Sequence, residues 1–191
     1  PPMKLVRASI CQAQHVRGSP LCQKCQPGTS TEEASARAVC TNCPGGFHAS
    51  QPGAATCTRC IPGRAQLTPG SPSCINCEKG KSTQEKAAQT ECVNCVAGLY
   101  AQASGSAKCN PCAMGTASLS GQASCSDCPA GFMSAQAEPS CTNCPAGRYQ
   151  DRSKQGSCLP IEPGSMASGC SAAGTGCNFS SKCPENWKGV D

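Results

Sequence analysis

Cysteine is the residue whose number and spacing in this chain could support chemistry. The 191 residues contain 21 cysteines, and sixteen of these form eight C-x-x-C pairs. Cysteines at this spacing can hold zinc as four thiolates, act as a thioredoxin-like redox centre, or form structural disulfides. The eight pairs are Cys22/Cys25, Cys40/Cys43, Cys57/Cys60, Cys74/Cys77, Cys92/Cys95, Cys109/Cys112, Cys125/Cys128 and Cys141/Cys144.

Other residue types with catalytic potential form no recognisable group. The chain has two histidines, His15 and His48, and neither has a recognisable nucleophile partner. The eleven acidic residues are scattered and lack the paired spacing that acid/base catalysis or a metal site requires. We therefore expect no enzyme activity, no cofactor and no bound metal.

Structural disulfides are the favoured use of the cysteines. A redox C-x-x-C needs a βαβ scaffold, which this chain does not show. Zinc bound by two C-x-x-C pairs is the main alternative. Such sites would have to account for all eight pairs and would leave the single cysteines at both ends of the series without a role. Because disulfides persist in oxidising compartments, we expect the secretory pathway and an extracellular or cell-surface location.

A glycine stands three residues after the second cysteine of every pair. The pairs recur along the chain at a nearly constant period of roughly 16 to 18 residues, which is the pattern of a tandem repeat. Glycine adopts positive φ or allows a close backbone approach without steric cost, so a tight turn is expected after each second cysteine. The turn glycines are Gly28, Gly46, Gly63, Gly80, Gly98, Gly115, Gly131 and Gly147.

Loop entropy favours bonds between successive pairs. A bond within one C-x-x-C closes a very short ring, whereas closing a loop of about 15 residues is worth roughly 3 kcal/mol in the chain-entropy treatment. The second cysteine of one pair should therefore bond to the first of the next, with single cysteines completing the two ends. The predicted bonds are Cys11–Cys22, Cys25–Cys40, Cys43–Cys57, Cys60–Cys74, Cys77–Cys92, Cys95–Cys109, Cys112–Cys125, Cys128–Cys141 and Cys144–Cys158.

The C-terminal segment departs from this period. Ile161 stands where the next second cysteine should be, although Gly164 keeps its position. We expect one bond among Cys170, Cys177 and Cys183, with the third cysteine free or bonded outside this chain. The predicted divisions are an N-terminal lead-in (1–21), an array of about eight repeats (22–164) and a C-terminal cap or start of another module (165–191).

The composition argues against a single hydrophobic core. Leu, Ile, Val and Phe together supply nineteen residues, and 3% of the chain is aromatic. The loops between cysteine pairs are polar, with short stretches that could form two-stranded ribbons and no helical apolar stripe. We predict small disulfide-rich tandem repeats with short β-ribbons and little other regular structure. Contacts limited to neighbouring repeats would make an elongated rod.

The phrases CTNCPGGFHA, CSDCPAGFMS and CTNCPAGRYQ resemble the tandem cysteine-rich repeats called ephrin-receptor-like. Tumour-necrosis-factor-receptor and EGF-like modules are more distantly similar. The resemblance covers roughly residues 22 to 164 and implies staggered local disulfides in an elongated, extracellular arrangement. Two phrases, CINCEKGKS and CVNCVAGLY, lack the proline of the pattern. The family occurs in receptors, adhesion proteins and matrix proteins, so the resemblance implies architecture and location without an activity.

Four aromatic residues follow the repeat glycine by one or two positions. Each ring could cover a disulfide, which we favour, or face a protein partner. A separate motif, Asn178-Phe179-Ser180, matches the N-glycosylation sequon. The four aromatics are Phe47, Tyr100, Phe132 and Tyr149.

The expected function is that of an extracellular structural or adhesion segment, a rigid spacer or interaction rod in a surface assembly, filament or matrix. The alternative is the ligand-binding ectodomain of a cell-surface receptor. The charge of +5 is spread thinly, so we expect protein partners, including copies of the chain or subunits of a larger assembly, and no nucleic acid. No stretch approaches the roughly 20 apolar residues of a membrane span. The N-terminal residues suggest a processed product or a piece of a longer protein.

Overall fold

The computed structural model of the chain describes residues 13–14, 23–31, 39–162, 165–168 and 179–182. Within these residues there is no helix, and each strand pairs with one other strand to form a two-stranded sheet. The strands are β1 (Ala13–Gln14), β2 (Gln23–Lys24), β3 (Thr29–Ser30), β4 (Thr41–Asn42), β5 (Phe47–His48), β6 (Thr58–Arg59), β7 (Arg64–Ala65), β8 (Ile75–Asn76), β9 (Lys81–Ser82), β10 (Val93–Asn94), β11 (Leu99–Tyr100), β12 (Asn110–Pro111), β13 (Thr116–Ala117), β14 (Ser126–Asp127), β15 (Phe132–Met133), β16 (Thr142–Asn143), β17 (Arg148–Tyr149), β18 (Leu159–Pro160), β19 (Ser165–Ser168) and β20 (Phe179–Lys182).

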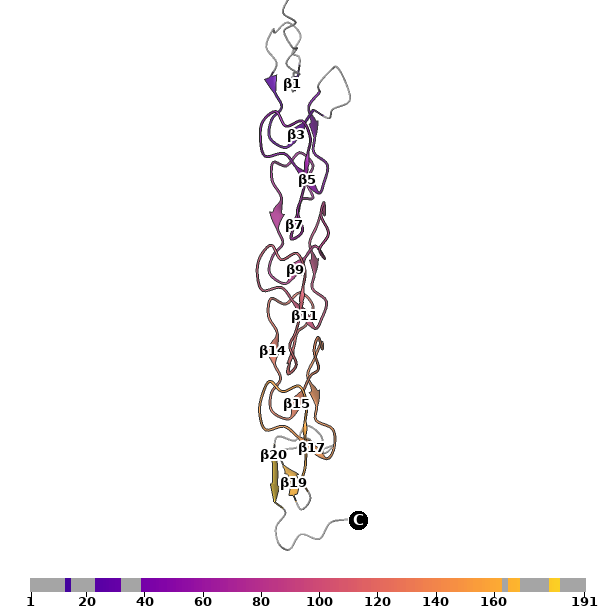
Figure 1. Cartoon of the computed structure of the whole chain (residues 1–191), viewed down its shortest axis with the longest axis vertical. Coiled ribbons are helices and arrows are strands. Elements are labelled where there is room, and N and C mark those ends of the chain that lie inside the picture. Colours follow the sequence, from indigo (N-terminus) through magenta and orange to yellow (C-terminus); the bar gives the residue numbers. More distant parts are fainter. Residues whose placement is uncertain (1–12, 15–22, 32–38, 163–164, 169–178, 183–191) are drawn as a thin grey trace, which may run out of the picture. The chain divides into compact units, whose positions relative to one another are not determined.

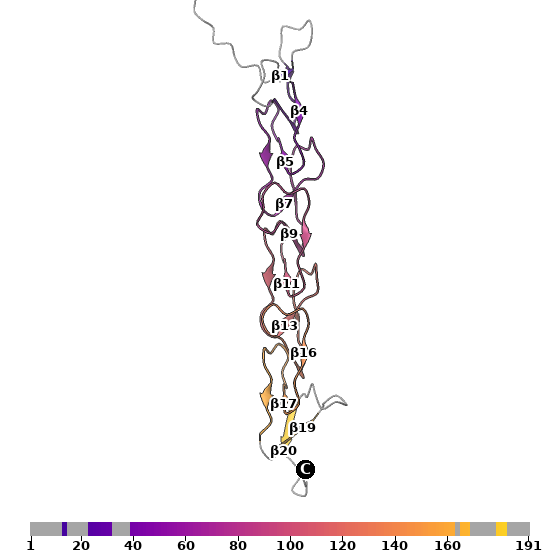
Figure 2. The same ribbon diagram turned by 90° about the vertical axis from the view of Figure 1, so that its right-hand side faces the viewer.

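The chain divides into two compact units whose segments alternate near the middle of the sequence. The first unit comprises Pro1–Cys77, Ser82–Val93 and Gly105–Ala107, and the second comprises Glu78–Lys81, Asn94–Ser104 and Lys108–Asp191. In the first unit the hairpins β3–β4, β5–β6 and β7–β8 follow one another (Figure 1). In the second unit β11–β12, β13–β14, β15–β16 and β17–β18 do the same (Figure 2).

Each repeat is one hairpin closed by one disulfide. We number the repeats 1 to 8 by their opening cysteines, which are bonded to the cysteine 13 to 15 residues further along. The structure therefore has the second-to-first connectivity throughout this series. The bonds are Cys25–Cys40, Cys43–Cys57, Cys60–Cys74, Cys77–Cys92, Cys95–Cys109, Cys112–Cys125, Cys128–Cys141 and Cys144–Cys158.

The buried interior consists of sulfur and small side chains. The eight opening cysteines are at most 1% exposed, and their buried neighbours are mainly alanine, serine, threonine and glutamine. Large apolar residues such as Leu67 (72% exposed) and Leu119 (68%) lie at the surface instead. The prediction of small disulfide-rich repeats without a single hydrophobic core is confirmed. The elongated arrangement of the whole chain stays a prediction.

The repeat glycines form the first turn of each hairpin. All eight have φ between +79° and +88°, a region that side chains with a Cβ rarely adopt. In repeat 5, the amide of Leu99, just after Gly98, donates to the carbonyl of Val96 at 3.0 Å. The glycine is thus required locally by the backbone conformation of the turn.

In repeats 2 to 8 a second turn, at the far end of the hairpin, also contains a residue with positive φ. We call this residue the tip residue. It is glycine in four repeats and has a side chain in three, with φ between +56° and +79°. The tip residues of repeats 2 to 8 are Gly53, Gly70, Ala88, Gly105, Gly121, Ala137 and Lys154.

Candidate functional site: the joint between successive repeats

The tip residue connects its repeat to the preceding one. In repeat 6, the amide of Gly121 donates to the carbonyl of Cys95, the opening cysteine of repeat 5, at 2.8 Å. The equivalent bond recurs in seven repeats at 2.7 to 2.9 Å. It attaches each tip to the backbone of a disulfide-bonded, fully buried cysteine, so the joint is anchored at the most constrained point of the neighbouring repeat.

The turn glycine makes two further connections to the next repeat. Its amide donates to the carbonyl of a buried residue there, as from Gly98 to Ser118 at 2.7 Å. Its carbonyl accepts from the next opening cysteine, as from Cys112 to Gly98 at 2.9 Å. The amide of Gly63 uses the hydroxyl Oγ1 of Thr83 instead, at 2.8 Å. Three backbone connections therefore join a typical repeat to its neighbour.

The turn glycine also lies against the tip of the second repeat along. A Cβ added at Gly98 would overlap the carbonyl oxygen of Ala137, which is the tip residue of repeat 7. The same relation holds for Gly28 with Gly70 and for Gly63 with Gly105. These glycines are thus required twice, once by positive φ and once by a close approach of backbone to backbone.

Gly147, in repeat 8, meets only the first of these requirements. Its φ is +79°, but a Cβ there would have no heavy atom within 4 Å. A substitution at Gly147 therefore measures the conformational cost of replacing a turn glycine, without the cost of the close approach.

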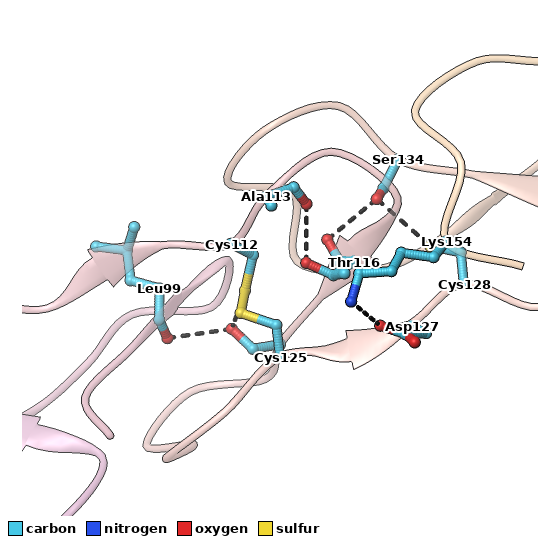
Figure 3. The surroundings of a disulfide bond; sticks show 10 residues. Leu99, Cys112, Ala113, Thr116, Cys125, Asp127, Cys128, Ser134 and Lys154 are labelled. Atoms are coloured by element: carbon cyan, nitrogen blue, oxygen red, sulfur yellow. Dashed lines mark hydrogen bonds and ion pairs between the residues drawn. A yellow bond between two sulfur atoms is a disulfide. The ribbon is translucent and has the colours of Figure 1, made fainter. Parts of the chain in front are cut away.

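A side chain of the hairpin stem supports the tip of the second repeat along. A Cβ at the tip residue Gly105 would lie 3.4 Å from Asn76 Cγ, and one at Gly121 would lie 3.4 Å from Asn94 Cγ. At the tip of repeat 8 the equivalent residues are charged, and Lys154 Nζ lies 3.3 Å from Asp127 Oδ1 (Figure 3). The residue before an opening cysteine thus contacts the tip residue of the second repeat along. The sequence analysis did not predict this contact.

Buried hydroxyl groups satisfy backbone carbonyls beside the disulfides. Ser134 Oγ donates to the carbonyl of Thr116 at 3.0 Å, and Ser118 Oγ donates to the carbonyl of Leu99 at 3.1 Å. Figure 3 shows the contact to the Leu99 carbonyl beside the Cys112–Cys125 bond, and the Ser134 contact next to Cys128. Each serine lies within the repeat that follows its acceptor, so the small polar interior adds hydrogen bonds across the joint as well as filling space.

An exposed ion pair within repeat 4 contributes little to stability. Lys81 Nζ donates to Glu78 Oε2 at 2.8 Å, and this bond, together with the positive charge of Lys81, holds the pKa of the Glu78 carboxyl below its ordinary value. The contribution is present at neutral pH and is lost as the pH falls through the lowered pKa of Glu78. Both groups are in contact with solvent, so screening keeps the effect small.

The four predicted aromatics do not occupy one position of the hairpin. Phe47 and Phe132 directly follow the turn glycine, whereas Tyr100 and Tyr149 are the second residue after it. All four are half-buried. Successive strand residues point to opposite faces, so the phenylalanines and the tyrosines belong to different faces of their hairpins. Their contact with a partner stays a prediction.

Several predicted site residues lie outside the described residues. These include both cysteines of the Cys11–Cys22 bond and the sequon asparagine, Asn178. The three cysteines for which one bond was expected, Cys170, Cys177 and Cys183, also lie outside. Among the described residues, no helix has the length and apolar character needed to cross a membrane.

The tip residues could have been found from the sequence. Pro-Gly at 52–53 and 69–70 and Ser-Gly at 104–105 and 120–121 are turn signals that recur with the repeat. The turn signal was not recognised as periodic because three of the seven tip residues are not glycine. Ala88, Ala137 and Lys154 adopt positive φ because the bond to the preceding cysteine backbone and the surrounding joint hold them there.

Replacing Ala137 with glycine should stabilise the chain. Its φ is +63°, which costs alanine roughly 1 to 2 kcal/mol and glycine almost nothing. Glycine adds about 0.4 to 1 kcal/mol of unfolded-chain entropy, so we expect a net gain of about 0.5 to 1 kcal/mol in urea unfolding. The control, Ala146→Gly, replaces an exposed alanine without positive φ and should lose stability. Equal responses of the two variants would refute the strain at the tip.

The fold and its joints define a class: tandem cysteine-rich repeats, each a two-stranded hairpin with one disulfide, joined by backbone hydrogen bonds to neighbouring repeats. The sixteen cysteines of these bonds are disulfide sulfurs and not the thiolates that a zinc or redox site requires. No protein-family model matches the chain, and no curated protein sequence matches it.

Proposed function

We propose that this chain is an extracellular structural segment, a rigid disulfide-stapled spacer or interaction rod in a surface assembly, filament or matrix. The observation that carries the proposal is the repeated joint. Each typical joint combines backbone connections to the next repeat with a glycine that contacts the second repeat along. A repeat held by two successive neighbours has little freedom to bend, which suits a spacer.

The sulfur chemistry supports the proposed location. Eight disulfides in one chain need an oxidising environment to form and persist. The resemblance of CTNCPAGRYQ and related phrases to ephrin-receptor-like repeats supports the same location. The proposed partners are proteins, including further copies of the chain, and the proposal assigns no catalytic role.

Small-angle scattering of the oxidised chain tests the proposed shape. A compact domain of 191 residues has a radius of gyration of about 16 Å. A rod on the order of 100 Å long, from eight extended repeats, should give about 25 Å or more. A value near that of the compact domain would contradict the spacer.

A shortened chain provides the matched control. Removing residues 95–127 deletes two whole repeats and leaves Cys92 and Cys128 in one C-x-x-C. In a rod the maximum dimension should fall by about a quarter, because length is proportional to repeat number. A compact domain would shrink by less than about a tenth.

A further inference from the structure

The last described hairpin has the pairing register of a repeat. In repeat 1, Thr29 follows the turn glycine and lies opposite Asn42, the residue before the next opening cysteine. In the last hairpin, Ser165 follows Gly164 and lies opposite Lys182, the residue before Cys183. Met166 lies opposite Ser181, as Ser30 lies opposite Thr41. The two hairpins therefore have the same register at both residue pairs of β3–β4.

The backbone that leads into this hairpin also follows the repeat. The amide of Ile161 donates to the carbonyl of Gly147 at 3.1 Å, which is the bond that an opening cysteine makes to the preceding turn glycine. The amide of Ser165 donates to the carbonyl of Glu162 at 3.0 Å, as Leu99 does to Val96 in repeat 5. Ile161 thus makes the amide hydrogen bond of an opening cysteine without its sulfur.

We propose that Ile161 and the hairpin β19–β20 belong to a ninth repeat that has lost its disulfide, with Ile161 and Ser180 at the positions of the two bonded cysteines. Ser180 stands three residues before Cys183, as Cys125 stands three before Cys128. Both cysteines of one bond are absent together, while the Ser165–Glu162 hydrogen bond and the register are kept. The array then extends to residue 180, and Cys183 takes the sequence position that opens another repeat.

The ninth repeat has a longer strand ladder in place of the covalent bond. Strands β19 and β20 pair over four residues each, whereas the strands of repeats 1 to 8 pair over two. A ladder can open and close without a redox reaction, unlike a disulfide. Because it lacks the covalent bond, we expect the ninth repeat to open locally more often than repeats 1 to 8.

Introducing the absent bond tests the assignment. In repeats 1 to 8 the bonded Cα atoms are 5.5 to 5.8 Å apart. The double variant Ile161→Cys/Ser180→Cys should form a disulfide when refolded with oxidised glutathione, which takes up the two electrons and two protons of the thiols. Non-reducing peptide mapping should find the new bond together with the bonds of repeats 1 to 8.

A variant shifted by one residue is the control. In Ile161→Cys/Ser181→Cys the second cysteine moves to the opposite face of the strand, so no bond between the two should form. The assignment is overturned if the shifted variant forms its bond as completely as the designed one, or if the designed pair stays reduced while the eight native bonds are intact.

Hydrogen exchange on the unmodified chain gives a second readout that does not depend on refolding a variant. The amide of Ile161 and the strands 165–168 and 179–182 should be protected together, and should exchange at least about tenfold faster than the strands of repeats 6 and 7. Exchange of these segments at the rate of unstructured peptides would overturn the ninth repeat. Exchange of these segments as slow as in repeats 6 and 7 would contradict the expectation that the ninth repeat opens locally.

Discussion

Replacing Gly98 with alanine is expected to destabilise the chain by about 3 to 5 kcal/mol, near the upper limit for a single substitution. Positive φ alone costs roughly 1 to 2 kcal/mol. The added Cβ would also overlap the carbonyl oxygen of Ala137, so the tip of repeat 7 has to move. That movement would break the bond from the Ala137 amide to the carbonyl of Cys112. Urea unfolding monitored by circular dichroism measures the total loss of unfolding free energy. Hydrogen exchange then shows which repeats are destabilised.

Gly147→Ala is the matched control for this substitution. Gly147 has nearly the same φ as Gly98, +79° against +83°, and open space where the Cβ would lie. Its cost should therefore be the conformational one, roughly 1 to 2 kcal/mol. Equal losses in the two variants would show that the close approach of repeats 5 and 7 contributes nothing.

Removing the Cys112–Cys125 bond should cost about 3 kcal/mol or more. The bond closes a loop of 13 residues' separation, and its release restores about 3 kcal/mol of unfolded-chain entropy. Cys112 is fully buried, and its carbonyl holds the tip of repeat 7. In the variant Cys112→Ser/Cys125→Ser, exchange should accelerate most in repeat 6, less in repeats 5 and 7, and least in repeat 2.

Ala113→Ser provides the control for the double serine variant. It places a serine at an exposed position beside Cys112 and leaves the bond intact, so the change should stay within about 0.5 kcal/mol. Uniform acceleration across all repeats in the double variant would mean that the chain unfolds as one cooperative body and not by neighbouring repeats.

The hairpins and their bonds were predictable because cysteine and glycine act locally. A disulfide such as Cys60–Cys74 depends on one short loop, and a turn glycine such as Gly63 reports the backbone of one turn. The composition also predicted the small, sulfur-rich interior. Each of these features recurs in every repeat. The same cysteine and glycine pattern could therefore be recognised several times in one chain.

The contacts between alternate repeats could not be predicted from the same pattern. The approach of Gly98 to Ala137 depends on how two hairpins stack on a third, which the period of the sequence does not specify. The same holds for Asp127 and Lys154, which form an ion pair although they belong to repeats 6 and 8. The hairpin β19–β20 was not predicted because the predictions followed cysteine, and the feature that identifies it is its pairing register.

The measurement that tests this account most directly is disulfide mapping of the native chain. Digestion at acidic pH without reductant prevents exchange of the bonds, and mass spectrometry then identifies the linked peptides. We predict links from each opening cysteine to the first cysteine of the following pair, as in Cys43–Cys57 and Cys95–Cys109. Bonds within single C-x-x-C pairs, or thiols that react freely with an alkylating agent, would contradict the stapled repeats and the joints built on them.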